Sequence, residues 1–247
     1  MAWLILAAVF LPLFPFAAVF NAALARIRRP TARFVLMLLW PQAGVAAIQF
    51  AGTAVPEAFL WWALGSAALY ALRLLTVRDL GVYAGFLASS SLALTWGLGV
   101  AGAPWRQVSL FAFWFTLPAA FLGLFTGPLI GRFGAAYAGI CAGMGRSMPR
   151  LAAALVFVVL AGVATAPFPA FFAQWLLLRE LGGAAVVAVL VIWLVWGWAA
   201  AILLRGFVFG TPSSVPVVDI GRGAAWSLWI ALAMFVLAGI YLTGAGA

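Results

Sequence analysis

Apolar residues form long blocks along this chain, and polar residues fall in the short gaps between the blocks. The blocks cover about 3 to 24, 33 to 53, 58 to 76, 80 to 101, 107 to 131, 149 to 166, 169 to 179, 184 to 208 and 224 to 243, with a Gly-rich stretch at 135 to 148. A helix that spans a bilayer needs about 20 predominantly apolar residues. The pattern therefore predicts an all-α, polytopic transmembrane helix bundle of about eight to nine helical segments.

One apolar region carries its own interruption, "APFPAFFAQWLLL" at 166 to 178. Pro167 and Pro169 have no backbone N–H, so we expect one proline-broken helix here, with carbonyl groups released from their intrahelical bonds. Gln174 lies about one and a half turns past Pro169, and helical side chains point back toward the N-terminus. We therefore expect the Gln174 amide to hydrogen-bond to the break, directly or through one water. In the alternative, Gln174 bonds to a neighbouring helix.

Composition supports a membrane protein, since 68% of the 247 residues are hydrophobic and 7% are charged. A soluble domain of this size could not bury so much apolar surface. We expect a single transmembrane domain over 1 to 247. No nucleophile–base pair, metal cluster or phosphate-binding loop is visible, so we predict no enzyme and no catalytic, cofactor-binding or metal-binding residue. The single cysteine, Cys141, is interpreted as a small buried apolar residue.

The formal charge of +9 comes from thirteen basic residues, all of them arginine. Most fall in the gaps between blocks, where the positive-inside rule and anionic lipid headgroups account for them, so we do not expect nucleic-acid binding. Across the first five blocks, one predicted side holds only Arg106 and the other holds Arg26, Arg28, Arg29, Arg33, Arg73, Arg78, Arg132, Arg146 and Arg150. We predict a bacterial inner membrane protein with its N-terminus outside and the loop from Ala25 to Thr31 in the cytoplasm.

Titratable groups are missing from the predicted interior. The chain has no His and no Lys, and its four acids, Glu57, Asp79, Glu180 and Asp219, fall at block ends or in loops. Intramembrane charges usually mark an ion path, and side chains that stay neutral near pH 7 cannot relay protons. The candidate polar contacts at depth are Ser89, Ser90, Ser91 and Thr116, together with Gln174.

Two further features concern helix contacts. Gly123, Gly127 and Gly131 are spaced four apart, so one helix face is bare enough for close packing, which we expect within this chain rather than at a dimer face. Tryptophans near block ends suit interface anchors, namely Trp40, Trp61, Trp62, Trp105 and Trp226. Trp193, Trp196 and Trp198 fall mid-block, where contact with lipid or a neighbouring helix is expected, and a pigment or quinone contact is the alternative.

The motif order resembles the antiporter-like membrane subunits of respiratory complex I, its hydrogenase relatives and Mrp-type cation/proton antiporters. The motifs are "RDL" at 78 to 80, "ASSSLAL" at 88 to 94, "GMGRSMPRLAAAL" at 143 to 155, the proline break, and "LLRGFVFG" at 203 to 210. The resemblance covers about 60 to 243. It implies that the region 58 to 243 corresponds to the second half of such a subunit, preceded here by two helices in 1 to 53.

The resemblance also implies a role for the break. In the family, the broken helix lines a hydrated path, and the position matching Gln174 is an acid or a lysine. The family helix before it carries histidines and a lysine, whereas 110 to 125 here has only Thr116 as a polar side chain. We therefore predict a shortened subunit that scaffolds or seals a larger membrane complex without pumping protons. The expected partners are other membrane subunits and lipids. The alternative is a subunit that conducts protons or ions for a respiratory or inorganic-carbon uptake complex.

Overall fold

The structure is a computed structural model that describes residues 2 to 52, 54 to 211 and 218 to 245. Within these ranges the regular elements are helices and no strand forms. The helices are α1 (Ala2–Phe10), α2 (Ala17–Arg26), α3 (Pro30–Ala51), α4 (Glu57–Leu74), α5 (Leu80–Val100), α6 (Trp105–Phe133), α7 (Met144–Ser147), α8 (Pro149–Gly162), α9 (Pro169–Glu180), α10 (Gly183–Val208) and α11 (Arg222–Ala245).

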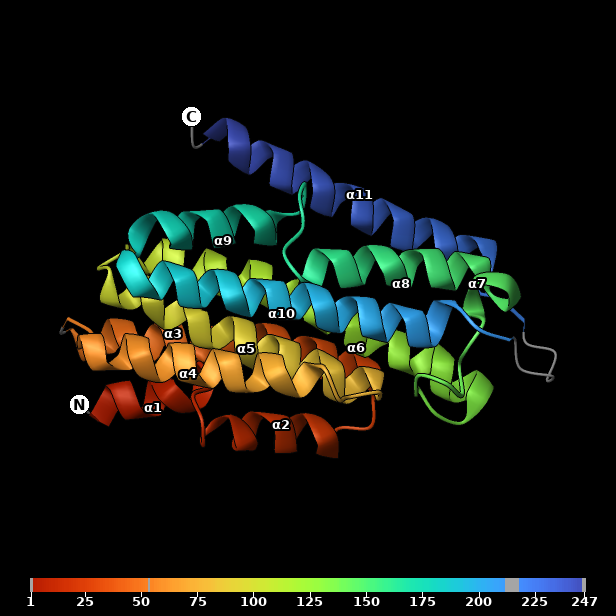
Figure 1. Cartoon of the computed structure of the whole chain (residues 1–247), viewed down its shortest axis with the longest axis horizontal. Coiled ribbons are helices and arrows are strands. Elements are labelled where there is room, and N and C mark those ends of the chain that lie inside the picture. Colours follow the sequence, from red (N-terminus) through yellow and green to blue (C-terminus); the bar gives the residue numbers. More distant parts are fainter. Residues whose placement is uncertain (1, 53, 212–217, 246–247) are drawn as a thin grey trace.

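The helices share one long axis, with both chain ends at the same end of the bundle (Figure 1). Four segments are long and apolar enough to cross a membrane by themselves: α3, α6, α10 and the Arg222–Tyr241 part of α11. Helices α1 and α2 lie end to end on one side of the bundle, and α8 and α9 lie end to end on the opposite side (Figure 1). Each of these pairs therefore crosses the bundle as one interrupted unit, which resolves the path of the chain after Pro167.

The predicted class is confirmed, but two details of the prediction were wrong. The described residues form eleven helices rather than eight to nine segments, and they contain two broken helices rather than one. The block at 3 to 24 is divided because Pro12 and Pro15 remove backbone donors, which ends α1 at Phe10 and delays α2 to Ala17. The Gly-rich stretch adds the short helix α7, which begins after Gly143 with its left-handed φ of 76°.

Helix α5 is the centre of the fold. Nearly all of its residues are buried, including the continuous run from Leu87 to Leu98. A helix that is apolar all round is a core helix, and this one packs against α2, α4, α6 and α9. Asp79 begins it by accepting a hydrogen bond from the Val82 N–H at 2.9 Å. The central position of α5 places its serines away from the bundle surface.

The glycine row on α6 faces α3 only in part. A Cβ at Gly127 would lie 3.0 Å from Pro30 Cγ, and a Cβ at Gly123 would lie 3.8 Å from Met37 Sδ. At Gly131 no atom lies within 4 Å. Since α3 and α6 are among the most extensively packed pairs, the close approach at Gly127 is a contact within the chain.

The charged residues divide sharply between the two ends of the bundle, and all of them belong to the described ranges. Eleven arginines and two acids lie at the end that holds the α2–α3, α4–α5, α6–α8 and α10–α11 connections. Two arginines, Arg106 and Arg179, and two acids, Glu57 and Glu180, lie at the other end. The whole formal charge of +9 therefore belongs to one end, which we call the arginine-rich end.

Candidate functional site

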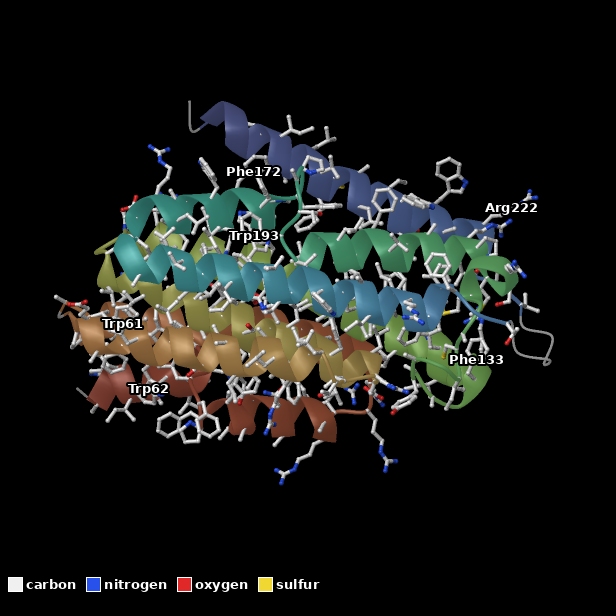
Figure 2. The ribbon with its side chains drawn as sticks, in the orientation of Figure 1. Trp61, Trp62, Phe133, Phe172, Trp193 and Arg222 are labelled. Carbon is white, nitrogen blue, oxygen red and sulfur yellow. The ribbon has the colours of Figure 1, made fainter. Side chains whose placement is uncertain are left out.

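The candidate site is the break between α8 and α9, which we call the second break and which covers 163 to 168. Its released carbonyls have partners. Trp193 of α10 donates its indole N–H to the Val163 carbonyl at 2.9 Å, and Thr165 donates both its backbone N–H and its hydroxyl to the Leu160 carbonyl. Figure 2 shows Trp193 beside the turn that joins α8 to α9. Trp193, which lies in the middle of a predicted apolar block, therefore hydrogen-bonds directly to the second break.

Helix α11 packs directly against the second break at Gly239. A Cβ added at Gly239 would lie 2.1 Å from the Pro167 carbonyl oxygen and 3.0 Å from the Pro169 nitrogen. No side chain could occupy this position without moving backbone atoms. Phe235, one turn earlier, stacks near Phe168 with ring centroids 5.8 Å apart. The absence of a side chain at 239 therefore determines how closely α11 approaches the break.

Gln174 makes no direct hydrogen bond to the break, so the direct form of the predicted bond is not formed, and the bond through one water stays a prediction. It is fully buried on the α9 face that also carries Ala170, Ala173 and Leu177. Neither its amide nitrogen nor its amide oxygen has a hydrogen-bond partner among the described residues. The carbonyls of Leu160 and Val163 instead accept hydrogen bonds from Thr165 and Trp193. The alternative bond to a neighbouring helix is also not formed.

A comparable break that we had not predicted lies between α1 and α2; we call residues 11 to 16 the first break. Three indoles from three helices bond to carbonyls in or beside it: Trp40 to Val9 at 3.2 Å, Trp96 to Leu11 at 3.0 Å and Trp62 to Phe14 at 2.7 Å. Ser66 also accepts a hydrogen bond from the Phe14 N–H at 3.0 Å. Pro12 and Pro15 were the available sequence signal. Trp40 and Trp62 therefore hydrogen-bond to this break, and their role as interface anchors stays a prediction.

Two of the three serines of α5 link helices. Ser90 accepts a hydrogen bond from the Trp196 indole at 2.8 Å and donates to the Ala67 carbonyl at 2.7 Å, so it joins α10 to α4. Ser89 accepts from the Asn21 amide at 2.9 Å, which joins α5 to α2. Ser91 donates within its own helix to Ala88 at 3.2 Å. Asn21, which we had not selected, lies against Gly85, where a Cβ would come within 2.7 Å of its side-chain oxygen.

Some buried polar atoms have no partner among the described residues. They are the hydroxyls of Tyr83 and Thr95, the indole N–H of Trp114 and both amide atoms of Gln174. Trp114 packs beside Phe235 of α11, which itself contacts Phe168 of the second break. By contrast, Thr116 bonds to the Ala112 carbonyl of its own helix. Unpaired polar atoms therefore lie close to the second break, and a water or a partner group could bond there.

None of the four acidic residues lies in the interior of the helix bundle. Glu57 is the first residue of α4, Asp79 is the N-cap of α5, and Glu180 is the last residue of α9. Asp219 accepts hydrogen bonds from the N–H groups of Arg150 and Leu151 at the start of α8. Cys141 lies outside the long helices, and burial raises the pKa of its thiol, which keeps it protonated and unreactive. No group of three or more His, Cys, Asp or Glu residues could hold a metal within the described ranges.

Solved structures with this arrangement come from respiratory and antiporter complexes. A chain of respiratory complex I from Thermus thermophilus with bound NADH matches with a TM-score of 0.83 at 21% identity, over 97% of this chain and 54% of that one. This chain therefore has the fold of a complex I membrane subunit. A chain of the membrane-bound sulfane sulfur reductase, an archaeal respiratory membrane complex, matches with a TM-score of 0.78 at 17% identity, over 96% of this chain and 51% of that one.

A third match is to the Mrp complex from Dietzia sp. DQ12-45-1b, with a TM-score of 0.74 at 14% identity over 97% of this chain and 55% of that one. No protein-family profile and no curated protein matches the sequence. The resemblance predicted from the motifs is thus confirmed at the level of the fold, and the chain spans about half the length of the structures it matches. At these identities the comparison establishes the fold and leaves activity open.

Proposed function

We propose that this chain is a membrane subunit of a complex I-like or antiporter-like assembly and that it scaffolds or seals the assembly without pumping protons itself. The support comes from the second break, where the family's charged position is Gln174. The buried polar residues of the described ranges are Ser66, Ser89, Ser90, Ser91, Thr95, Thr116, Thr126 and Gln174. Each is neutral at pH 7 and has no proton to exchange near that pH. The acids lie at helix ends or, in the case of Asp219, in a loop.

A dependence on partner subunits follows from the outer helices of the bundle. Both α10 and α11 expose large apolar side chains, including Leu194 at 71% and Trp226 at 68% exposure. The structures with the same fold belong to multi-subunit membrane complexes. We infer that neighbouring subunits and lipid cover these surfaces and that the chain acts as a non-catalytic component.

The charge distribution supports the orientation that we proposed from the sequence. Cytoplasmic ends carry an excess of arginine and lysine, so we place the arginine-rich end in the cytoplasm of a bacterial inner membrane and the N-terminus outside. Labelling an Ala2→Cys variant, with the buried Cys141 as internal background, tests this orientation. We expect modification by an impermeant maleimide from the periplasmic side, and modification from the cytoplasmic side alone would refute the orientation.

The functional test is proton flux through the isolated chain. Purified protein in liposomes with an internal pH dye, under an imposed potassium diffusion potential, should give the same proton leak as protein-free liposomes at pH 7. Addition of an uncoupler at the end of each trace shows that the dye responds. A protein-dependent leak proportional to the amount of chain would disprove the proposed non-pumping role.

A specific observation favours a second candidate, a subunit that conducts protons or ions within the assembly. The unpaired atoms of Gln174 and Trp114 lie near the second break, and polar groups without partners are the groups that buried water bonds. In that case water and partner side chains would complete the route. Flux that is absent with the isolated chain but appears when the co-purifying subunits are reconstituted, and that falls in a Gln174→Leu complex, would favour this candidate over the scaffold.

A further inference from the structure

Two motifs of the sequence meet at a cavity that the proposed function does not use. Arg78 of "RDL" and Arg205 of "LLRGFVFG" are separated by more than a hundred residues, and both line one cavity of about 470 Å³ at the arginine-rich end. Its walls also include Val77, Ile202, Leu203 and Phe209. The cavity thus combines two cations with apolar surface.

The cavity has a fixed frame. The Ala138 N–H bonds to the Arg78 carbonyl at 2.8 Å, and the Gly139 N–H bonds to the Gly206 carbonyl at 3.1 Å. The Gly143 N–H bonds to the Phe209 carbonyl at 3.0 Å. These three bonds connect the α4–α5 loop, the segment after α6 and the end of α10. These bonds therefore hold the backbone at Arg78 and beside Arg205 in place.

Both guanidinium groups are available to a ligand. Arg78 and Arg205 are exposed, and neither guanidinium forms a hydrogen bond or ion pair with any described residue. At the same end, the side chains of Arg132 and Arg150 differ from these two, because they donate to the carbonyls of Val218 and Ile220. Two unpaired guanidinium groups on one cavity favour a phosphate, which accepts several charge-assisted hydrogen bonds.

A shallow apolar groove lies along α10, the helix that also carries Arg205. It has a volume of about 610 Å³ and is lined by Leu190, Trp193, Leu194, Gly197, Trp198 and Ala201. Together with Ile202 and Arg205, these lining residues recur at intervals of three or four, so all of them lie on one face of α10. No atom lies within 4 Å of a Cβ placed at Gly197, which leaves the middle of the groove open.

The length of this surface corresponds to one lipid molecule. From Leu190 to Arg205 the helix rises about 22 Å at 1.5 Å per residue, and one leaflet with its headgroup region is about 20 to 22 Å thick. We propose that the Arg78–Arg205 cavity binds the phosphate of an anionic phospholipid and that the α10 groove holds an acyl chain of the same molecule. The site does not depend on whether the chain conducts protons.

The test titrates the purified full chain in neutral detergent with phosphatidylglycerol or phosphatidylcholine and measures bound lipid by native mass spectrometry. We expect phosphatidylglycerol to bind more tightly. Each of Arg78→Gln and Arg205→Gln should weaken it about fivefold, and the double variant about 30-fold. A double Arg→Lys variant should retain the preference. The matched control, Arg106→Gln with Arg179→Gln, changes two arginines at the opposite end and should bind like wild type. Equal binding of the two lipids to wild type, or unchanged binding in the Arg78 and Arg205 double variant, would overturn the proposal.

Filling the groove separates a lipid from a free phosphate. Gly197→Phe should weaken phosphatidylglycerol binding, whereas Gly65→Phe, at an exposed glycine of α4 with equal open space, should not. If millimolar inorganic phosphate displaces the lipid and Gly197→Phe has no effect, the site takes free phosphate and the lipid assignment is wrong. A photoreactive residue at Leu194 in native membranes should crosslink to lipid, and a crosslink to another protein subunit would instead assign the groove to a protein partner.

Discussion

The two breaks of this bundle differ in which groups hydrogen-bond to their released backbone carbonyls. At the first break, indoles from α3, α4 and α5 bond to three carbonyls, and Ser66 accepts the Phe14 N–H. At the second break, one indole and a local threonine supply the bonds, and unpaired polar atoms of Trp114 and Gln174 lie in the adjoining helices.

The difference shows that a broken helix has no fixed role. A break whose carbonyls accept hydrogen bonds from indoles of three neighbouring helices is a structural element. A break beside unpaired polar groups retains capacity for water or for a partner, because unpaired groups in an apolar interior cost free energy until they are satisfied. Under the proposed function, the second break is therefore the region where the isolated chain and the assembled chain would differ.

The largest effect is expected for Gly239→Ala. The new methyl group would meet the Pro167 carbonyl, so α11 must move away from the second break, and we expect a loss of about 3 kcal/mol, the upper part of the range for overpacking. Thermal unfolding in detergent measures it. Gly65→Ala, where no atom lies within 4 Å, is the matched control and should be neutral or slightly stabilising. Equal stability of the two variants would show that α11 does not depend on this contact.

A smaller loss is expected for Trp96→Phe at the first break. The indole N–H is fully buried, and its removal leaves the Leu11 carbonyl unpaired, which costs about 2 kcal/mol. Trp226→Phe changes an exposed ring and should have little effect on unfolding. A wild-type midpoint for Trp96→Phe would indicate that the first break is not maintained by its indoles.

Thr165→Val at the second break should cost less, about 0.5 kcal/mol. The hydroxyl is lost, but the Leu160 carbonyl keeps the Thr165 N–H at 3.2 Å, so no polar group becomes unpaired. The same unfolding experiment applies. A loss as large as that of Trp96→Phe would remove the proposed distinction between the breaks.

The smallest effect is expected for Gln174→Leu in the isolated chain. Because neither amide atom has a described partner, the substitution should change stability by less than about 0.5 kcal/mol or increase it. Comparison with the assembled complex makes the test sharper, since a partner or bound water that pairs the amide would make the variant destabilising there. A loss above about 1 kcal/mol in the isolated chain would mean that water already satisfies Gln174.

Much of the site could be located from the sequence, but its bonding could not. Pro167 and Pro169 predicted an interruption at 166 to 169, and the helix is interrupted there because proline cannot donate a backbone hydrogen bond. Gln174 was correctly placed on the helix that follows. The predicted direct bond from Gln174 to the break is not formed, and Trp193 of α10 donates to the Val163 carbonyl instead. Pro12 and Pro15 carry the same signal at the first break, where the apolar pattern predicts one continuous block over 3 to 24.

The sequence by itself determined that the chain is a membrane protein, that it is helical, that its charge is asymmetric, and that its acids lie at helix ends or in loops. Each of these follows from the chemistry of individual residues and from helix length. Tertiary structure alone decided which indole meets which carbonyl, which glycine admits α11 to the second break, and that Arg78 and Arg205 line one cavity. Those outcomes depend on packing between segments far apart in the chain, where a contact is set by the positions of two backbones and no local pattern records it.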